Sequence, residues 1–169
     1  MMMYEYKPLR GNHKARTASA LLLLASMIAF AGSALVPEYP FILQTVGLCL
    51  LIPLIQIVAR FLVVQYLYRL REREDGSVDF EVFTYRGGAR MQLVCRVSLT
   101  EIRAAAPLGE GNRKAPDGIH RYTYHPDLRP DTGMVLGITN YDGECELLLA
   151  PDQYLTDVFE RAVGQKREA

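Results

Sequence analysis

The sequence predicts a membrane-embedded α-helical hairpin followed by a small α+β domain. Three observations lead to this prediction. Two long runs without charged residues lie close together, at positions 17–36 and 41–59. From position 76 onward, apolar and polar side chains alternate as they do along half-buried strands. The last segment, 151–164, instead places its apolar residues at helical spacing.

The two uncharged runs predict a pair of transmembrane helices. They contain 20 and 19 residues, and about 20 residues cross a ~30 Å hydrocarbon core at ~1.5 Å per residue. The connector holds only Pro37, Glu38, Tyr39 and Pro40. Its two prolines end one helix and preset the next. We therefore expect a tight hairpin rather than two separated helices.

The charges that flank the two runs predict the orientation of the hairpin. Residues 1–16 carry four Lys or Arg against one Glu, and the connector carries no Lys or Arg. The second run is followed by Arg60, Arg69, Arg71 and Arg73. The positive-inside rule then places both termini in the cytoplasm, in a multi-pass protein of the inner or plasma membrane. A cleaved signal peptide is the rival interpretation, but a second apolar run follows almost at once.

The same four arginines are candidate contacts with the membrane interface. A basic cluster there can hold anionic headgroups. Marking the topology is the simpler interpretation, because Glu72, Glu74 and Asp75 cancel much of the positive field. We divide the chain at this charged exit into a cytoplasmic segment 1–16, a hairpin 17–75 and a cytoplasmic domain 76–169.

The composition of the chain excludes some classes of partner. Lys and Arg number 19 and so do Asp and Glu, which weighs against a nucleic-acid-binding protein. Residues 76–169 hold 11 basic and 14 acidic side chains, a net charge of about −3. The overall field of this domain therefore does not draw it to an anionic lipid surface.

The pattern of the domain is mainly that of strands. The alternating segments are 78–82, 91–99, 121–124, 134–138 and 145–149. Arg86-Gly87-Gly88 and Asp142-Gly143 are turn signals. The stretch 104–119 is rich in Gly and Pro without periodicity, and we interpret it as a long loop whose Arg113 and Lys114 are candidate partner contacts. Pro151 and Asp152 predict the start of a helix, and Gly164 its end.

The order of these elements resembles the membrane-anchored bacterial pleckstrin-homology-like (PH-like) domains. Short phrases that carry the resemblance are Tyr68-Arg69-Leu70, Arg86-Gly87-Gly88, Val97–Ile102 and Leu147–Phe159. The resemblance covers roughly residues 60–165. It implies a small antiparallel bent sheet or barrel of about six or seven strands, capped by a C-terminal helix. It also implies interaction or scaffolding roles without a fixed chemistry.

Phosphoinositide binding does not carry over from the resemblance. The eukaryotic pocket needs clustered basic residues around the first hairpin, and this hairpin offers only Arg86 and Arg90.

No pattern of catalytic or metal-binding residues is evident. Cys49, Cys95 and Cys145 stand apart without a CxxC pair and are interpreted as buried small apolar residues. His120 and His125 are five apart, on opposite faces of a strand, and are expected at the surface. Asp79 and Glu81 share a strand face. They could form an acid–base pair, but the solvated side of the strand is the simpler interpretation because no nucleophile is nearby.

The function predicted is that of a non-enzymatic membrane protein. We expect its cytoplasmic domain to bind a protein partner, a second copy of itself or lipid, with no cofactor, no metal, no nucleic acid and no identified small-molecule substrate. An alternative is a subunit of a membrane transporter or enzyme complex that acts through its helices, suggested by Gln44 and Gln56 in the second run and Arg60 beside it. A third is a sensor of the bilayer state.

Overall fold

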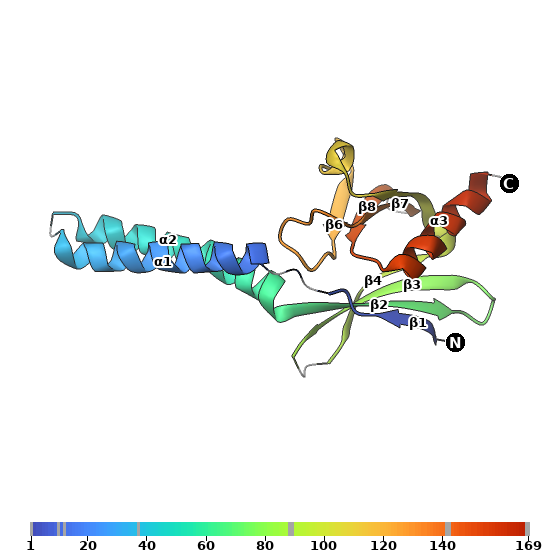
Figure 1. Cartoon of the computed structure of the whole chain (residues 1–169), viewed down its shortest axis with the longest axis horizontal. Helices are drawn as coiled ribbons and strands as arrows, with labels where there is room; N and C mark the ends of the chain where they lie inside the picture. Colours follow the sequence, from blue (N-terminus) through green and yellow to red (C-terminus); the bar gives the residue numbers. More distant parts are fainter. Residues whose placement is uncertain are drawn as a thin grey trace. The chain divides into compact units, whose positions relative to one another are not determined.

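The computed structural model describes residues 2–9, 11, 13–36, 38–87, 90–140 and 143–167. The chain divides into two compact units (Figure 1). Residues 11–64 form a helical unit, and residues 1–10 together with 65–169 form a two-sheet unit. Residues from both ends of the chain therefore contribute to the second unit.

The helical unit consists of α1 (His13–Leu35) and α2 (Pro40–Ile57), and α2 continues into a π-helical turn, η1 (Val58–Val63). Both helices are long and apolar enough to cross a membrane, as the sequence predicts. Pro40 is the first residue of α2, where its missing N–H costs no hydrogen bond. Pro37, the other predicted helix breaker, lies outside the described residues.

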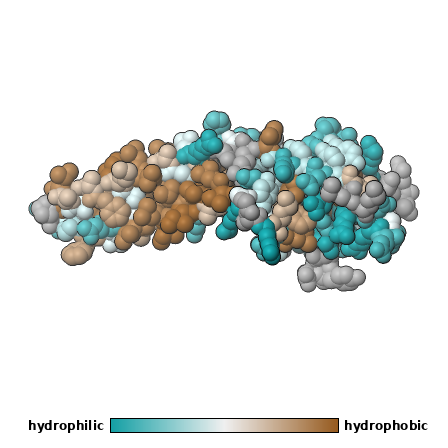
Figure 2. All heavy atoms as spheres, turned by 90° about the horizontal axis from the view of Figure 1, so that it is seen from below, coloured by the Kyte–Doolittle hydropathy of each residue, from teal (hydrophilic) through white to brown (hydrophobic). Residues whose placement is uncertain are grey.

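The two helices pack closely at one small residue. Gly47 of α2 lies against Phe30 of α1, whose ring would be 3.0 Å from a Cβ at that position. Ser26 of α1 donates a hydrogen bond of 3.0 Å to the Gly47 carbonyl. Large apolar side chains elsewhere on both helices are exposed, as the hydrophobic surface in Figure 2 shows. An apolar surface of this extent suits lipid better than water.

Sheet A of the two-sheet unit has the strand order β1-β2-β3-β4. Its strands are β1 (Met2–Tyr6), β2 (Val64–Glu72), β3 (Val78–Arg86) and β4 (Gln92–Ser98). β1 runs antiparallel to β2, with Tyr6 opposite Tyr68. β3 and β4 form the next antiparallel pair.

Sheet B has the order β5-β7-β8-β6 and is followed by helix α3. Its elements are β5 (Ile102–Pro107), β6 (His120–Thr123), β7 (Met134–Asn140), β8 (Gly143–Leu149) and α3 (Gln153–Arg167). Two single 3₁₀ turns flank β5, namely η2 (Leu99–Glu101) and η3 (Glu110–Asn112). β6 runs parallel to β8, so sheet B is mixed and not wholly antiparallel as predicted.

The core of this unit is built from both sheets and α3. The ring of Phe80 on β3 meets Phe159 of α3 edge to face, with ring centroids 5.0 Å apart. Tyr68 on β2 packs on the other side of Phe80, at 5.8 Å. Leu136, Leu149 and Leu155 are among the fully buried residues that complete the core. The C-terminal helix thus closes the apolar interior, which the amphipathic pattern of its sequence predicts.

Several predicted boundaries differ from the observed ones. Residues 64–72 form a strand, whereas the sequence assigned them to the hairpin and its charged exit. Residues 102–107 form β5 rather than the start of a loop, because their backbone pairs with β7. α3 continues through Gly164 to Arg167. The turn at Asp142 and part of the turn at Gly88 lie outside the described residues.

The predicted helix start and the predicted strands at 78–82, 91–99, 134–138 and 145–149 are confirmed. Asp152 caps α3, because its Oδ1 accepts a hydrogen bond of 3.0 Å from the Leu155 N–H. Within the described residues, six strands come from 76–169, and β1 and β2 are added from outside that range.

Candidate functional site

A cluster of charged side chains occupies one face of sheet A. Successive strand residues point to opposite faces, so Phe80 and Val82 of β3 enter the core while Asp79 and Glu81 point the other way. The two carboxylates are nonetheless only 2% and 1% exposed. Apolar neighbours therefore bury one face of β3, and charged neighbours bury the other. The interpretation of Asp79 and Glu81 as a solvated edge of the strand is wrong.

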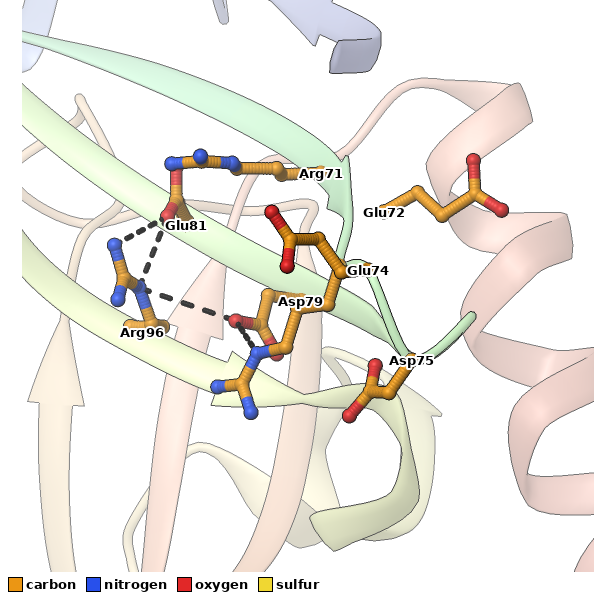
Figure 3. Close-up of a pocket in the computed structure, with 8 residues that line it drawn as sticks. Arg71, Glu72, Glu74, Asp75, Asp79, Glu81 and Arg96 are labelled. Carbon is orange, nitrogen blue, oxygen red and sulfur yellow. Dashed lines mark hydrogen bonds and ion pairs between the residues drawn. The ribbon is translucent and has the colours of Figure 1, made fainter. Parts of the chain in front are cut away.

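Two arginines from neighbouring segments bury these carboxylates (Figure 3). Arg73, just after β2, donates from Nε to Asp79 Oδ2 at 2.7 Å. Arg96 lies directly opposite Glu81 in the β3–β4 register, and its Nε and Nη2 are 2.9 and 2.7 Å from Glu81 Oε1. The hydrogen bond to Asp79 raises the pKa of Arg73. The Arg73 guanidinium therefore stays charged at neutral pH.

The burial within these pairs is one-sided. The side chains of Arg73 and Arg96 are 49% and 46% exposed, although their carboxylate partners are almost inaccessible. Long basic side chains often lie over a surface in this way and keep their charged heads in water. The arginine side chains thus lie between the buried carboxylates and solvent.

One oxygen of the cluster has no hydrogen-bond partner. Asp79 Oδ1 is buried, and none of the described residues donates to it. Buried carboxylate oxygens are satisfied in nearly all native structures, because desolvation without a hydrogen bond is costly. Asp79 Oδ1 can therefore accept one more hydrogen bond than the described residues supply.

An open pocket of about 490 Å³ lies over this cluster. Every residue that lines it is charged, as Figure 3 shows: Arg71, Glu72, Arg73, Glu74, Asp75, Asp79, Glu81 and Arg96. This lining contains no Ser, Thr, Cys, His or Lys that could serve as a nucleophile or neutral base. Asp79 and Glu81 are both already held by guanidinium groups. The lining therefore offers a ligand only charged contacts and hydrogen bonds from carboxylates and guanidinium groups.

The charged face continues from the pocket toward β1. Arg69 forms an ion pair of 3.1 Å with Glu5, and its guanidinium lies 4.7 Å from the centre of the Phe83 ring. Arg69, Arg71 and Arg73, which the sequence suggested as interface contacts, thus lie on or beside one sheet with the buried carboxylates. Their spacing of two, typical of one strand face, is a signal that sequence reasoning missed.

The remaining predicted site residues lie elsewhere. Arg60 belongs to η1 of the helical unit, where its guanidinium is 5.5 Å from the Phe61 ring centre. Arg113 and Lys114 are exposed in the loop before β6. Arg121 holds this loop in place, since its guanidinium donates to the carbonyls of Asn112, Arg113 and Lys114 at 2.8–3.2 Å.

Two predictions about histidines and cysteines need correction. His125 is buried rather than at the surface: its Nδ1 accepts a hydrogen bond of 3.1 Å from the Asp127 N–H, and burial lowers its pKa. Cys49 is exposed on α2, while Cys95 and Cys145 are half-buried. Burial raises the pKa of Cys95 to about 11, so it is a neutral thiol. Within the residues described, no group of three metal-ligating side chains occurs.

Comparison with known protein families, curated proteins and solved structures gives no match.

Proposed function

We propose that the chain is a membrane-anchored, non-enzymatic interaction module. In this proposal, α1 and α2 cross the inner or plasma membrane, and the two-sheet unit lies in the cytoplasm. This unit binds a protein partner over the charged pocket of sheet A. The single observation that carries the binding role is the buried, unpartnered Asp79 Oδ1 at an open pocket.

The pairing of β1 with β2 supports the anchoring role. β1 precedes the helical hairpin in the chain and β2 follows it directly, yet the two strands are neighbours in sheet A. Two membrane crossings return a chain to its starting side, so the pairing suits a spanning hairpin. Tyr4 of β1 also packs on Tyr154 with ring centroids 4.4 Å apart, and its hydroxyl donates to Asp152. Both ends of the hairpin are thereby attached to one folded unit.

The resemblance to membrane-anchored PH-like domains supports the same proposal. A C-terminal helix that follows the strands is the part of the structure in line with this resemblance, which implies a single antiparallel sheet or barrel rather than two four-stranded sheets. The absence of a nucleophile from the pocket lining favours recognition over catalysis. The flanking basic residues of the apolar runs favour a cytoplasmic location for the unit.

A pull-down of the full chain tests the proposal. Cells that carry the protein are briefly crosslinked, the protein is purified in mild detergent, and co-purifying proteins and lipids are identified by mass spectrometry. The test variant is Glu74→Lys, an exposed change at the rim of the pocket. The control is Glu144→Lys, the same charge reversal at an exposed position of β8.

We expect one partner protein to co-purify in near-stoichiometric amount with the wild type and with the Glu144→Lys control. This partner should be lost with Glu74→Lys. Enrichment of lipid alone would overturn the proposal of a protein partner. A partner retained equally by both variants would overturn the assignment of the binding site to this pocket.

A role through the membrane helices is the second candidate. Its favouring observation is that Gln44 and Gln56 are both exposed on α2, an otherwise apolar helix. Amides at such positions can hydrogen-bond a neighbouring transmembrane helix. If this role is correct, replacing both with Leu abolishes the association of the chain with a membrane partner. Retention of the partner would contradict it.

A further inference from the structure

We propose that the pocket on sheet A receives the guanidinium group of an arginine side chain from the protein partner. This inference rests on the proposed function and specifies the chemistry of its ligand. Three features of the pocket lead to it: its charge balance, its unpartnered oxygen and its size.

The charge balance of the pocket favours a cation. The eight lining residues comprise five carboxylates and three guanidinium groups, a net charge of −2. Arg73 and Arg96 already pair with Asp79 and Glu81. The excess negative charge therefore lies at the rim, which is formed by Arg71, Glu72, Glu74 and Asp75. Hydrogen bonds from the Ser77 hydroxyl and N–H lower the pKa of Asp75, so this rim carboxylate is ionised at neutral pH. A rim of this charge attracts a positive group.

The unpartnered oxygen favours a hydrogen-bond donor at the base of the pocket. Asp79 Oδ2 accepts from Arg73, whereas Oδ1 has no donor within the described part of the chain. A carboxylate can accept a guanidinium on each of its two sides, and such charge-assisted bonds are stronger than neutral ones. An incoming guanidinium would bond Oδ1 and extend toward the rim carboxylates with its remaining N–H groups.

The dimensions of the pocket also favour a side chain over a metal ion. Its volume of about 490 Å³ falls within the range of organic ligand pockets, roughly 300–1,000 Å³. No cluster of three metal-ligating groups is present among the residues described.

Entry of the ligand requires movement of the Arg73 side chain. Asp79 Oδ1 is inaccessible in this conformation, and the half-exposed Arg73 holds the other oxygen of the same carboxylate, Oδ2, at 2.7 Å. Rotation of the Arg73 side chain uncovers the carboxylate while the strand pairing stays intact. The Nε–H signals of Arg73 and Arg96 should therefore report binding.

The test is an NMR titration of the full chain in detergent micelles. The probe is N-acetyl-arginine amide. N-acetyl-citrulline amide is its neutral counterpart of nearly equal shape, and N-acetyl-lysine amide carries a compact charge. We expect the arginine probe to shift the Arg73 and Arg96 Nε–H signals with a dissociation constant in the millimolar range. Citrulline should bind at least about fivefold more weakly, because it lacks the charge.

Three variants locate the site. Asp79→Asn should weaken arginine binding at least about tenfold, because it removes the buried charged acceptor. Glu74→Gln should weaken it about two- to fivefold and leaves the folded sheet unchanged, since this rim residue is exposed. Glu144→Gln on β8 is the matched control and should not change binding. If Asp79→Asn does not fold, Glu74→Gln still decides the question.

The outcomes separate this inference from the proposed function. Equal binding of citrulline, equal binding of lysine, or no shift with arginine would each overturn the guanidinium ligand. A partner that is lost with Glu74→Lys although arginine does not bind would retain the proposed function and overturn only this inference. Arginine binding in a protein that captures no partner would retain the site and overturn the proposed function.

Discussion

At the scale of single residues, Asp79 and Glu81 show how a strand can be buried on both faces without an apolar second layer. Each carboxylate lies beneath a guanidinium whose head remains half in water. A buried ion pair adds little net stability relative to apolar residues, but removing the arginine of either pair leaves a desolvated carboxylate. Loss of one arginine should therefore lower the free energy of unfolding by more than the intact ion pair contributes to it.

Glu81→Gln should destabilise the two-sheet unit. The amide removes the charge that Arg96 contacts with two nitrogens at 2.9 and 2.7 Å, and loss of such a charged hydrogen bond costs about 1–3 kcal/mol. Urea denaturation followed by near-ultraviolet circular dichroism measures the change. The exposed Glu144→Gln should stay within about 0.5 kcal/mol of the wild type. Equal stability of the two variants would contradict the role given to Glu81.

Gly133→Ala should strongly destabilise the two-sheet unit, although it adds only one methyl group. A Cβ at this position would lie 2.7 Å from the Leu149 carbonyl oxygen and 3.3 Å from His125 Cδ2, on a backbone with φ of +155°. The backbone oxygen must move, so we expect a loss of at least about 2 kcal/mol in unfolding free energy. Gly109→Ala meets nothing within 4 Å and serves as the control. A small effect at Gly133 would mean that β8 can shift freely there.

The sequence predicts part of the candidate site. The period of β3 places Asp79 and Glu81 on one face. Their burial depends on Arg73 and Arg96, which reach them from other parts of sheet A. These side-chain contacts join residues 6 and 15 positions apart. The alternation within β3 does not reveal them, so the two carboxylates look solvated when β3 is considered alone.

At the scale of elements, the strands with clear alternation and the helix with a strong apolar face are predictable, whereas β1, β2 and β5 are not. β5 contains three alanines and ends at a proline, residues with little intrinsic preference for strands. β2 follows the second helix directly, so its charged half resembles a membrane exit. β1 is a strand of five residues that forms only through its pairing with β2.

Tyr68 of β2 contacts two other segments of the chain through its hydroxyl group. The hydroxyl donates to the Tyr124 carbonyl at 3.0 Å and accepts from the Ala150 N–H at 3.1 Å. It thereby connects β2 to the residue after β6 and to the residue after β8. Burial raises the pKa of Tyr68 well above its usual value of about 10.

This shift predicts a loss of stability at alkaline pH. Above about pH 10 the unfolded chain releases the Tyr68 proton while the folded chain retains it, so deprotonation favours unfolding. Stability should therefore be fully present below pH 10 and fall as pH rises further. Tyr4, whose hydrogen bond to Asp152 raises its pKa to about 12, contributes in the same direction.

Denaturation at intervals from pH 8 to pH 11 measures this dependence. Tyr68→Phe should be less stable at neutral pH and show a shallower alkaline decline than the wild type. Tyr122→Phe, at an exposed ring, should reproduce the wild-type slope. A Tyr68→Phe slope equal to that of the wild type would contradict the buried, protonated state of this phenol.

At the scale of the whole molecule, the chain begins and ends in the same folded unit. Residues 1–10 and 65–169 form the two-sheet unit, and the helical hairpin is inserted between them. The two apolar helices follow from composition and length alone. The pairing of β1 with β2 could not be predicted, because residues 2–6 are too short a segment to show a reliable period.

In the proposed topology, the hairpin crosses the membrane twice and returns both of its ends to one side. Cysteine labelling tests this claim directly. Cys49, Cys95 and Cys145 are replaced with alanine, and single cysteines are introduced at Met3, Glu38 and Glu160, all exposed. A membrane-impermeant maleimide is then applied to intact cells and to permeabilised cells.

We expect Glu38→Cys to react with the maleimide in intact cells, and Met3→Cys and Glu160→Cys to react only after permeabilisation. Reaction of Met3→Cys and Glu160→Cys from opposite sides would contradict the pairing of β1 with β2. Reaction of all three positions from one side would show that the hairpin does not cross the membrane.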